Sequence, residues 1–482
     1  MPPITRRALI AATGAAPLIG APVMAQSPAK PPNIVFFLAD DLGYADVSCY
    51  GRPDISTPNI DRIAADGVRF TQGYANSAVC SATRTAIMTG RYQYRVRVGL
   101  EEPIEGPLNI GLSPSHPTLP SLLRARGYQT SLIGKWHLGR LPDFGPLQSG
   151  YDHFYGFRGG MLDYYTHTGS RHEDDLWDGD TPVRQIGYMT DLIGNHAVDA
   201  VNASAKSRSP FLLSVHFNAP HYPWEAIGDE AEAERLRTAS LAHYDGGTQR
   251  TYQRMIQRMD MQIGRVLQAL DDNGLAENTI VIFTSDNGGE RFADTWPFTG
   301  RKRELLEGGL RIPVILRWPA RVRPGRVAQQ VAISMDWLPT LLAAAGGAPD
   351  PAYPSDGMDL LPFLTQDAAP VPRKLFWRYK ANAQRAARDG DWKVLKVAGN
   401  TFLFNVVDDP MERANLRDRH RDIYDRLVGE WNEWNNGMMP EVRESYTGAV
   451  TATQLADHIG AKPVGDEPDL ATGWPSWKPS GP

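Results

Sequence analysis

The sequence predicts an α/β protein: a large, mainly parallel sheet sandwiched by helices, then a smaller C-terminal α+β domain of antiparallel strands and a helix. Three observations support this fold class. Short apolar runs alternate with helical segments from Pro31 to about Pro370, as in parallel sheets covered on both sides. The first run, NIVFFLA at 33–39, is apolar throughout, which is typical of a strand buried on both faces. After Pro370 the pattern changes to short strands joined by turns.

The elements of the large domain follow from this alternation. In TPNIDRIAADG, Thr57 is the expected N-cap, Pro58 the first helical residue and Gly67 the end of the helix. TLPSLLRARG at 118–127 has the same pattern. The other expected strands are 128–134, 211–217, 279–285 and 312–318, and the other expected helices are 251–274 and 334–347.

The expected small domain covers 371–440, after a large domain at 31–370. Its strands are expected within 374–380, 383–397 and 401–409, and its helix at 422–436. The remainder, 441–482, is a C-terminal extension that is rich in Pro and Gly towards its end.

The N-terminal residues 1–25 predict export. Arg6 and Arg7 precede a mildly apolar run that ends in VMA at Ala25, the layout of a cleaved signal peptide of twin-arginine type. We therefore expect a periplasmic or secreted bacterial protein. No later run reaches about 18 apolar residues, so no membrane span is expected. The net charge of −5 argues against a nucleic-acid binder and requires local cationic groups for any anionic substrate.

Polar side chains collect where four expected strands end. In open α/β sheets, ligands bind outside the carboxyl ends of the strands, so these side chains are expected to meet. They are Asp40 and Asp41, Lys135 and His137, His221, and Asp286 and Asn287.

The acidic and amide residues of this set suggest a metal site. Asp40, Asp41, Asp286 and Asn287 offer only oxygen, which suits Ca²⁺ or Mg²⁺. The structural alternative is that the Asp40–Asp41 pair caps the following turn. Two adjacent carboxylates at the end of a buried strand would, however, repel each other unless a cation lay between them.

The cationic residues suggest that the site binds an anion. Arg84, Lys135 and Lys302, with His137 and His221, could donate to an oxyanion held beside a divalent metal. Read alone, Lys302 would be a solvated surface charge.

The chain contains only two cysteines, Cys49 and Cys80, so that pair is the one intramolecular disulfide available. Cys80 lies in SAVCSATRTAIMTGRY at the expected start of a helix. Read alone, it would be a buried, inert thiol. The phosphate loop, the dinucleotide glycine fingerprint, HExxH and GxSxG are absent from the sequence.

Several segments together resemble the formylglycine-dependent type I sulfatases, of the arylsulfatase and N-acetylgalactosamine-sulfatase type within the alkaline phosphatase superfamily. The resemblance covers roughly 32–416 and implies a hydrolase that splits sulfate esters into an alcohol and inorganic sulfate, on an alkaline phosphatase-like fold. The segments occur in family order: NIVFFLADDLGYADVSCYG, TPNIDRIAADGVRFTQGYA, CSATRTAIMTGRY, GKWHLG, APHYPW, SDNGG and KRELLEGGLRIPVI.

The resemblance assigns Cys80 a modification. In this family the cysteine of C-x-P/A-x-R is oxidised by a maturation enzyme to formylglycine (3-oxoalanine), whose hydrate attacks sulfur and then expels sulfate by elimination. Ala82 and Arg84 complete the motif here, with alanine where proline is more frequent. The helix that begins near Ser81 would point free N–H groups and its positive end at the anion.

The resemblance also implies the other roles. One Ca²⁺, in preference to Mg²⁺, would be held by Asp40, Asp41, Asp286, Asn287 and the modified Cys80. Arg84 would hold the hydrate, and Lys135 and Lys302 the sulfate oxygens. His137 would be the base for elimination. His221, with Lys302 near it, would face the leaving-group oxygen as proton donor.

Two other functions remain open from the sequence. A phosphodiesterase or phosphonate monoester hydrolase of the same superfamily usually has histidine where this chain has Asn287. A non-catalytic exported binder of sulfated glycans would retain the fold alone. The expected substrate is a sulfated saccharide or an aryl sulfate. The loop aromatics Tyr164, Tyr165, Trp177 and Trp296 could stack on it or pack against the protein.

Overall fold

A ten-stranded sheet forms the centre of the protein in a computed structural model that describes residues 30–105, 109–366 and 368–448. The expected signal peptide and residues 449–482 lie outside the described residues. The strand order is β11-β2-β10-β9-β1-β8-β4-β5-β6-β7. Its strands are β1 (Asn33–Ala39), β2 (Val68–Phe70), β4 (Gln129–Lys135), β5 (His153–Phe157), β6 (Trp177–Asp178), β7 (Thr181–Pro182), β8 (Phe211–His216), β9 (Thr279–Ser285), β10 (Val314–Arg317) and β11 (Arg326–Ala328).

The middle of this sheet is parallel, as the sequence predicts. β9, β1, β8, β4 and β5 run in one direction, so their carboxyl ends lie at one edge. β10 pairs antiparallel with both β9 and β2. The fold class is therefore confirmed as a mixed, mostly parallel sheet.

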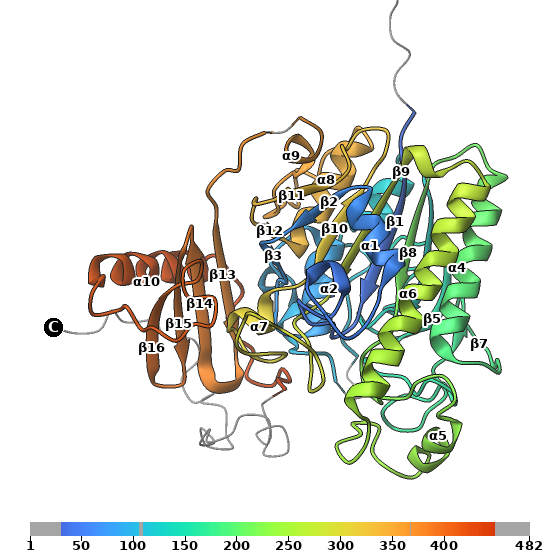
Figure 1. Ribbon diagram of the computed structural model, residues 1–482, viewed down its shortest axis with the longest axis horizontal. Helices are drawn as coiled ribbons and strands as arrows, with labels where there is room; N and C mark the ends of the chain where they lie inside the picture. The colour runs from blue at the N-terminus through green and yellow to red at the C-terminus, as the bar shows by residue number, and fades with distance from the viewer. Residues whose placement is uncertain (1–29, 106–108, 367, 449–482) are drawn as a thin grey trace, which may run out of the picture. The chain divides into compact units, whose positions relative to one another are not determined.

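Helices cover both faces of the sheet (Figure 1). Val35 and Phe37 of β1 pack into one core, whereas Ile34 and Phe36 pack into the other, because successive side chains of a strand point to opposite faces. The first core includes α1 (Pro58–Ala65), α4 (Met189–Ala205) and α6 (Gln249–Asp272), and the second includes residues of α2 (Cys80–Thr89), α3 (Leu119–Arg124), α8 (Trp337–Ala344) and α9 (Leu361–Thr365). In Figure 1, α4 and α6 run side by side. None of the helices in the described part of the chain combines the length and the apolarity needed to cross a membrane.

The C-terminal region forms a separate antiparallel sheet, as expected. β13 (Lys374–Tyr379), β14 (Gln384–Asp389), β15 (Trp392–Val397) and β16 (Asn400–Asn405) pair in sequence order, and α10 (Arg421–Asn436) packs on β14 and β15. The remaining elements are the strand pair β3 (Gly73–Tyr74) and β12 (Ala332–Ile333), and the helices α5 (Glu230–Leu236) and α7 (Glu307–Leu310).

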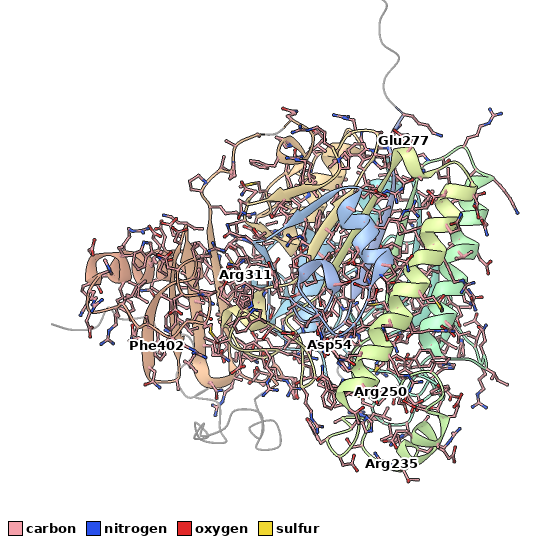
Figure 2. All side chains as sticks on the ribbon, viewed as in Figure 1. Asp54, Arg235, Arg250, Glu277, Arg311 and Phe402 are labelled. Carbon is pink, nitrogen blue, oxygen red and sulfur yellow. The ribbon has the colours of Figure 1, made fainter. Side chains whose placement is uncertain are left out.

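A buried ion cluster joins this small sheet to α7. Lys393 of β15 lies 2.9 Å from carboxylate oxygens of both Glu307 and Glu412. Arg311, labelled in Figure 2, donates to Glu307 at 2.6 Å. Removing one member would leave a buried charge without its partner, which typically costs about 3–5 kcal/mol. The cluster therefore fixes α7, which follows the loop that carries Lys302.

Thr57 occupies the predicted N-cap position of α1, before Pro58, but its side chain makes no capping hydrogen bond. Its hydroxyl instead accepts a hydrogen bond from the backbone N–H of Ser48, at 2.9 Å. The first-turn N–H groups of Asn59 and Ile60 are satisfied by the carboxylate of Asp260, in α6. A tertiary contact thus replaces the local cap. At α3 the expected capping by Thr118 is present.

Candidate active site

The side chains at the four predicted strand ends meet at one edge of the central sheet. Asp40 and Asp41 follow β1, and Asp286 and Asn287 follow its neighbour β9. Lys135 is the last residue of β4, and His221 follows β8 by five residues. α2 places Cys80 at its first position beside them, where the Cys80 sulfur and carboxylate oxygens of Asp40 and Asp286 lie within 4.8 Å of one another.

Three buried carboxylates form the acidic part of this cluster. Asp40, Asp41 and Asp286 are each inaccessible to solvent. Oδ1 of Asp40 and Oδ1 of Asn287 are buried and have no hydrogen-bond partner among the described residues. Unsatisfied buried acceptors are rare in native proteins and call for an unseen partner. An oxygen-only donor set with two free acceptors fits a hard divalent cation such as Ca²⁺.

The protonation of these carboxylates leads to the same conclusion. Burial, followed by the charge of Asp40, raises the pKa of Asp286 to about 7. At Asp41 burial acts to raise the pKa, but the charge of Lys302 opposes burial, and the net result is a pKa below the usual range. The raised pKa of Asp286 shows that its negative charge is not fully compensated by the neighbouring side chains, and a bound divalent cation would favour its ionised form.

The three predicted cations each pair with one of these carboxylates. Lys135 Nζ lies 2.5 Å from Asp40 Oδ2, and Lys302 Nζ lies 2.6 Å from Asp41 Oδ2. Arg84 donates through Nε to Asp286 at 3.0 Å. Burial alone would lower the pKa of Lys302, but the carboxylate of Asp41 outweighs burial and raises it above its usual value. Lys302 is therefore fully charged near neutral pH.

Cys80 is a poor nucleophile in its thiol form. It is 2% exposed, and burial raises its pKa to about 11 although Lys135 and Lys302 act in the opposite direction. Since the thiolate is the reactive species, a thiol with this pKa is almost wholly protonated near neutral pH. Its place at the N-terminus of the ten-residue helix α2 favours a bound anion.

The hydrogen bonds of the two predicted catalytic histidines define their tautomers. Nε2 of His137 lies 3.0 Å from the carbonyl oxygen of Ile104, so Nε2 carries the proton and donates it. The His137 Nδ1 lone pair is then buried without a partner among the described residues. Nδ1 of His221 donates to the carbonyl oxygen of Tyr222 at 2.6 Å, which leaves Nε2 facing Asp41 Oδ2 at 3.5 Å. Burial lowers the pKa of both rings, followed by the charge of Lys135 at His137 and of Lys302 at His221.

Two buried residues of this edge were missed by the sequence analysis. His216, the last residue of β8, has Nδ1 3.2 Å from the Lys135 carbonyl oxygen and 3.5 Å from Arg84. Both amide atoms of the Asn218 side chain are buried without a partner among the described residues. Both residues lie at the carboxyl end of β8, as His221 does, and this position in the sequence could have identified them as site residues.

The loop aromatics divide between the two alternatives that the sequence left open. Tyr164 is fully buried and its hydroxyl donates to the carbonyl oxygens of Asn218 and His221, so it packs within the protein. The Cζ atom of Arg158 lies over the ring of Trp177, 4.2 Å from the ring centroid. Trp296 is 65% exposed and remains available to a ligand.

Comparison with protein families gives two matches. A family model described as Sulfatase matches residues 32–348, which is more than half of the chain. A second model, described as N-sulphoglucosamine sulphohydrolase, C-terminal, matches residues 298–434.

Individual proteins agree with the family match. The chain is 31% identical to N-acetylgalactosamine-6-sulfatase of Rattus norvegicus, over 77% of this chain and 72% of the relative. It is 34% identical to arylsulfatase A of Homo sapiens, over 72% and 71% of the two chains. The solved structure of Ps i-CgsB in complex with k-i-k-neocarrahexaose superposes with a TM-score of 0.77 at 28% identity, covering 89% of this chain and 97% of that chain.

Proposed function

This chain belongs to the sulfatase family, as a type I sulfatase of the alkaline phosphatase superfamily that hydrolyses sulfate esters, and we propose that it does so through formylglycine at position 80 and a bound Ca²⁺. The observation that carries the proposal is the convergence of Cys80, Asp40 and Asp286 within 4.8 Å. Once formed, formylglycine supplies a hydrated aldehyde as nucleophile and a route for releasing sulfate, while Ca²⁺ polarises the S–O bonds. Conversion also explains how a thiol with a raised pKa comes to serve as a reactive centre.

The cationic side chains bind the sulfate in this proposal. An ammonium group has three hydrogens, and Lys135 and Lys302 each use one on a carboxylate, which leaves others for sulfate oxygens. Arg84 is fixed by Asp286 and by the carbonyl oxygen of Lys135, so it can hold the modified residue 80 in place. Asp40, Asp41, Asp286 and Asn287 would hold the Ca²⁺ together with that residue.

The histidines move the protons. His137 has a free Nδ1 lone pair and a lowered pKa, so near neutral pH it is a neutral base able to remove a proton from residue 80 as sulfate leaves. The Nε2 of His221 faces the site, and the protonated ring, which the nearby Asp41 carboxylate favours, would donate a proton from Nε2 to the oxygen of the departing alcohol. General acid–base steps of this kind contribute about 10²–10⁴-fold to rate.

Rates on 4-nitrophenyl sulfate and 4-nitrophenyl phosphate test the reaction class. We expect a clear preference for the sulfate ester in protein produced together with a formylglycine-generating enzyme. Cys80→Ala should abolish turnover, whereas Cys49→Ala, at the other cysteine, should retain it. A preference for the phosphate ester would instead favour a phosphodiesterase or phosphonate monoester hydrolase, and hydrolysis retained by Cys80→Ala would contradict the role of residue 80.

We further propose a sulfated saccharide as the natural substrate. Support comes from the saccharide bound in one structural neighbour, from the N-acetylgalactosamine-6-sulfatase relative, and from the exposed Trp296. A panel of sulfated saccharides and simple aryl sulfates tests the proposal. Turnover of the aryl sulfates alone would contradict it.

Export of the mature protein is part of the same proposal. Residues 1–25 carry the twin-arginine-like pattern, and the domains proposed from the sequence, 31–370 and 371–440, begin after it. N-terminal sequencing of protein from the periplasm should find a mature chain that starts after Ala25. An uncleaved chain retained in the cytoplasm would contradict export.

A further inference from the structure

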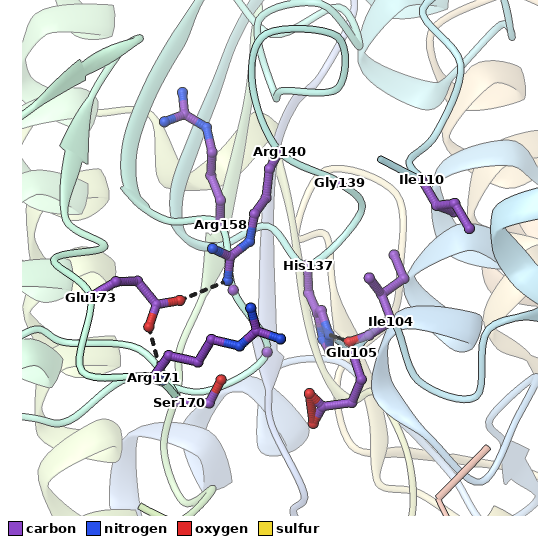
Figure 3. Close-up of a pocket in the computed structure, with 12 residues that line it drawn as sticks. Ile104, Glu105, Ile110, His137, Gly139, Arg140, Arg158, Ser170, Arg171 and Glu173 are labelled. Atoms are coloured by element: carbon purple, nitrogen blue, oxygen red, sulfur yellow. Dashed lines mark hydrogen bonds and ion pairs between the residues drawn. The ribbon is translucent and has the colours of Figure 1, made fainter. Parts of the chain in front are cut away.

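A small pocket with charged walls lies beside the candidate active site (Figure 3). Its volume is about 90 Å³, well below the roughly 300–1,000 Å³ of pockets that enclose a whole small-molecule ligand. It therefore suits a single substituent of a larger molecule. Its walls include Ile104, Glu105, His137, Arg140, Arg171 and Glu173.

Two contacts join this pocket to the reaction centre. The ring of His137, the proposed base, forms part of its wall. The backbone N–H of Ile104 donates to the hydroxyl of Ser81 at 2.8 Å, and Ser81 directly follows Cys80. The backbone at Gly160 packs so closely against His137 that a Cβ there would lie 2.7 Å from the ring. A substituent in the pocket would therefore lie next to a sulfate group bound at position 80.

The charges of the pocket are only partly neutralised. Glu173 accepts from the Arg140 guanidinium at 3.1 Å and from the Arg171 backbone N–H at 2.9 Å, so its carboxylate holds the loop together. The Arg171 guanidinium forms no hydrogen bond or ion pair with any residue that the structure describes, and Figure 3 shows it pointing into the pocket. Arg158 points away and pairs with Asp180 at 2.7 Å. Arg171 is thus the cation free to bind a ligand.

We propose that this pocket binds a second anionic substituent of the substrate, a carboxylate or another sulfate, through Arg171 with Arg140 beside it. The proposal rests on the proposed function, because it places a sulfate ester at residue 80. A guanidinium presents a planar fork of donors that matches both anions. Glu105, on the facing wall, has no cationic partner among the described residues and opposes the bound anion, which limits the affinity.

Binding to the Cys80→Ala protein tests the inference separately from catalysis, because this variant leaves the ester intact. Calorimetry would compare two pairs of ligands. The first pair is N-acetylgalactosamine 6-sulfate and its 4,6-disulfate. The second pair is a 6-sulfated disaccharide that carries glucuronate, as the free acid and as the methyl ester. The disulfate tests whether the second anion is a sulfate, and the free acid tests whether it is a carboxylate. We expect at least one of them to bind about tenfold more tightly than its singly charged counterpart, as one charge-assisted hydrogen bond provides.

The variants make the prediction specific. In the Cys80→Ala background, Arg171→Ala should remove this gain, Arg171→Lys should keep part of it, and Glu105→Gln should increase it. Arg208→Ala, an exposed arginine just before β8, should change nothing. Equal affinities for the ligands with one and two anions, or a gain that survives Arg171→Ala, would overturn the inference. If the unsubstituted protein turned over no sulfate ester but the variants gave the expected binding pattern, the proposed function would be contradicted and the inference about the pocket would stand.

Discussion

Gln384 in β14 of the small sheet accepts a hydrogen bond from the backbone N–H of Leu305, three residues after Lys302, at 2.8 Å. Its amide also donates to the carbonyl oxygen of Arg303 at 2.9 Å. The C-terminal sheet therefore holds the backbone directly after Lys302. This contact gives the small sheet a part in the active site although it supplies none of the predicted site residues.

Gln384→Ala should lower both stability and activity. It removes the hydrogen bonds to the buried Leu305 N–H and to the Arg303 carbonyl, and a buried group left unsatisfied costs about 1–3 kcal/mol. We expect kcat for 4-nitrophenyl sulfate to fall about tenfold, since a 1 Å displacement of a sulfate-binding group can cost up to about a hundredfold. Gln330→Ala is the matched control, because Gln330 is equally buried and bonds to Val331 and Val371. Equal kcat values for the two variants would contradict the positioning role.

His221→Ala should affect substrates according to their leaving group. The loss should approach about 10²–10⁴-fold for a saccharide sulfate, whose alkoxide needs a proton as it departs. It should be much smaller for 4-nitrophenyl sulfate, whose leaving group is stable as an anion. His153→Ala, at an exposed histidine that begins β5, serves as control. If both substrates slowed by the same factor, His221 would not be the proton donor.

Calcium should stabilise the folded protein. A ligand that binds only the folded state at a hundred times its Kd adds about 2.7 kcal/mol, so the melting temperature should rise with Ca²⁺ and fall on chelation. Asn287→Ala removes an unpartnered buried oxygen of the site and should shift the Ca²⁺ response to higher concentrations. Asn59→Ala, at an asparagine that bonds to Asp260, should not. An Asn287→Ala protein with an unchanged Ca²⁺ response would contradict the assigned metal site.

Glu225, which is not part of the metal site, makes the free energy of unfolding depend on pH. Burial, with the charge of Asp163, raises its pKa from 4.5 to about 9. The unfolded chain releases this proton at lower pH than the folded protein does, so the group favours unfolding increasingly as pH rises through that window. The slope for one proton is at most about 1.4 kcal/mol per pH unit.

Glu225→Gln should therefore stabilise the protein relative to the unsubstituted chain at pH 8 but hardly at pH 4.5. Denaturant unfolding at both values measures the difference. Glu277→Gln, at an exposed carboxylate labelled in Figure 2, should show no such trend. A difference that is constant with pH would mean that Glu225 ionises normally in the folded state.

The sequence predicted the parts of the site that depend on strand order. Parallel strands place their carboxyl ends at one edge, so apolar runs followed by Asp40, Lys135 and Asp286 sufficed to bring those residues together. The pairing of Lys302 with Asp41 could not be derived in this way, because it depends on a loop held by Gln384 from another sheet.

Three local features could not be derived from the sequence because tertiary contacts decide them. Thr57 lies at the predicted N-cap position, but its hydroxyl bonds to Ser48, and Asp260 accepts the hydrogen bond from the first-turn N–H of Ile60. His216 ends an apolar strand, where a histidine is easily taken for a core residue. Tyr164 lies in a polar loop, and only the structure shows that its ring is buried.

The mass of the tryptic peptide Phe70–Arg84 tests the central claim most directly. In active protein we expect this peptide with one sulfur and two hydrogens of Cys80 replaced by one oxygen, and we expect kcat to scale with the converted fraction across preparations. Full sulfatase activity in protein whose residue 80 is entirely an unmodified thiol would contradict the account.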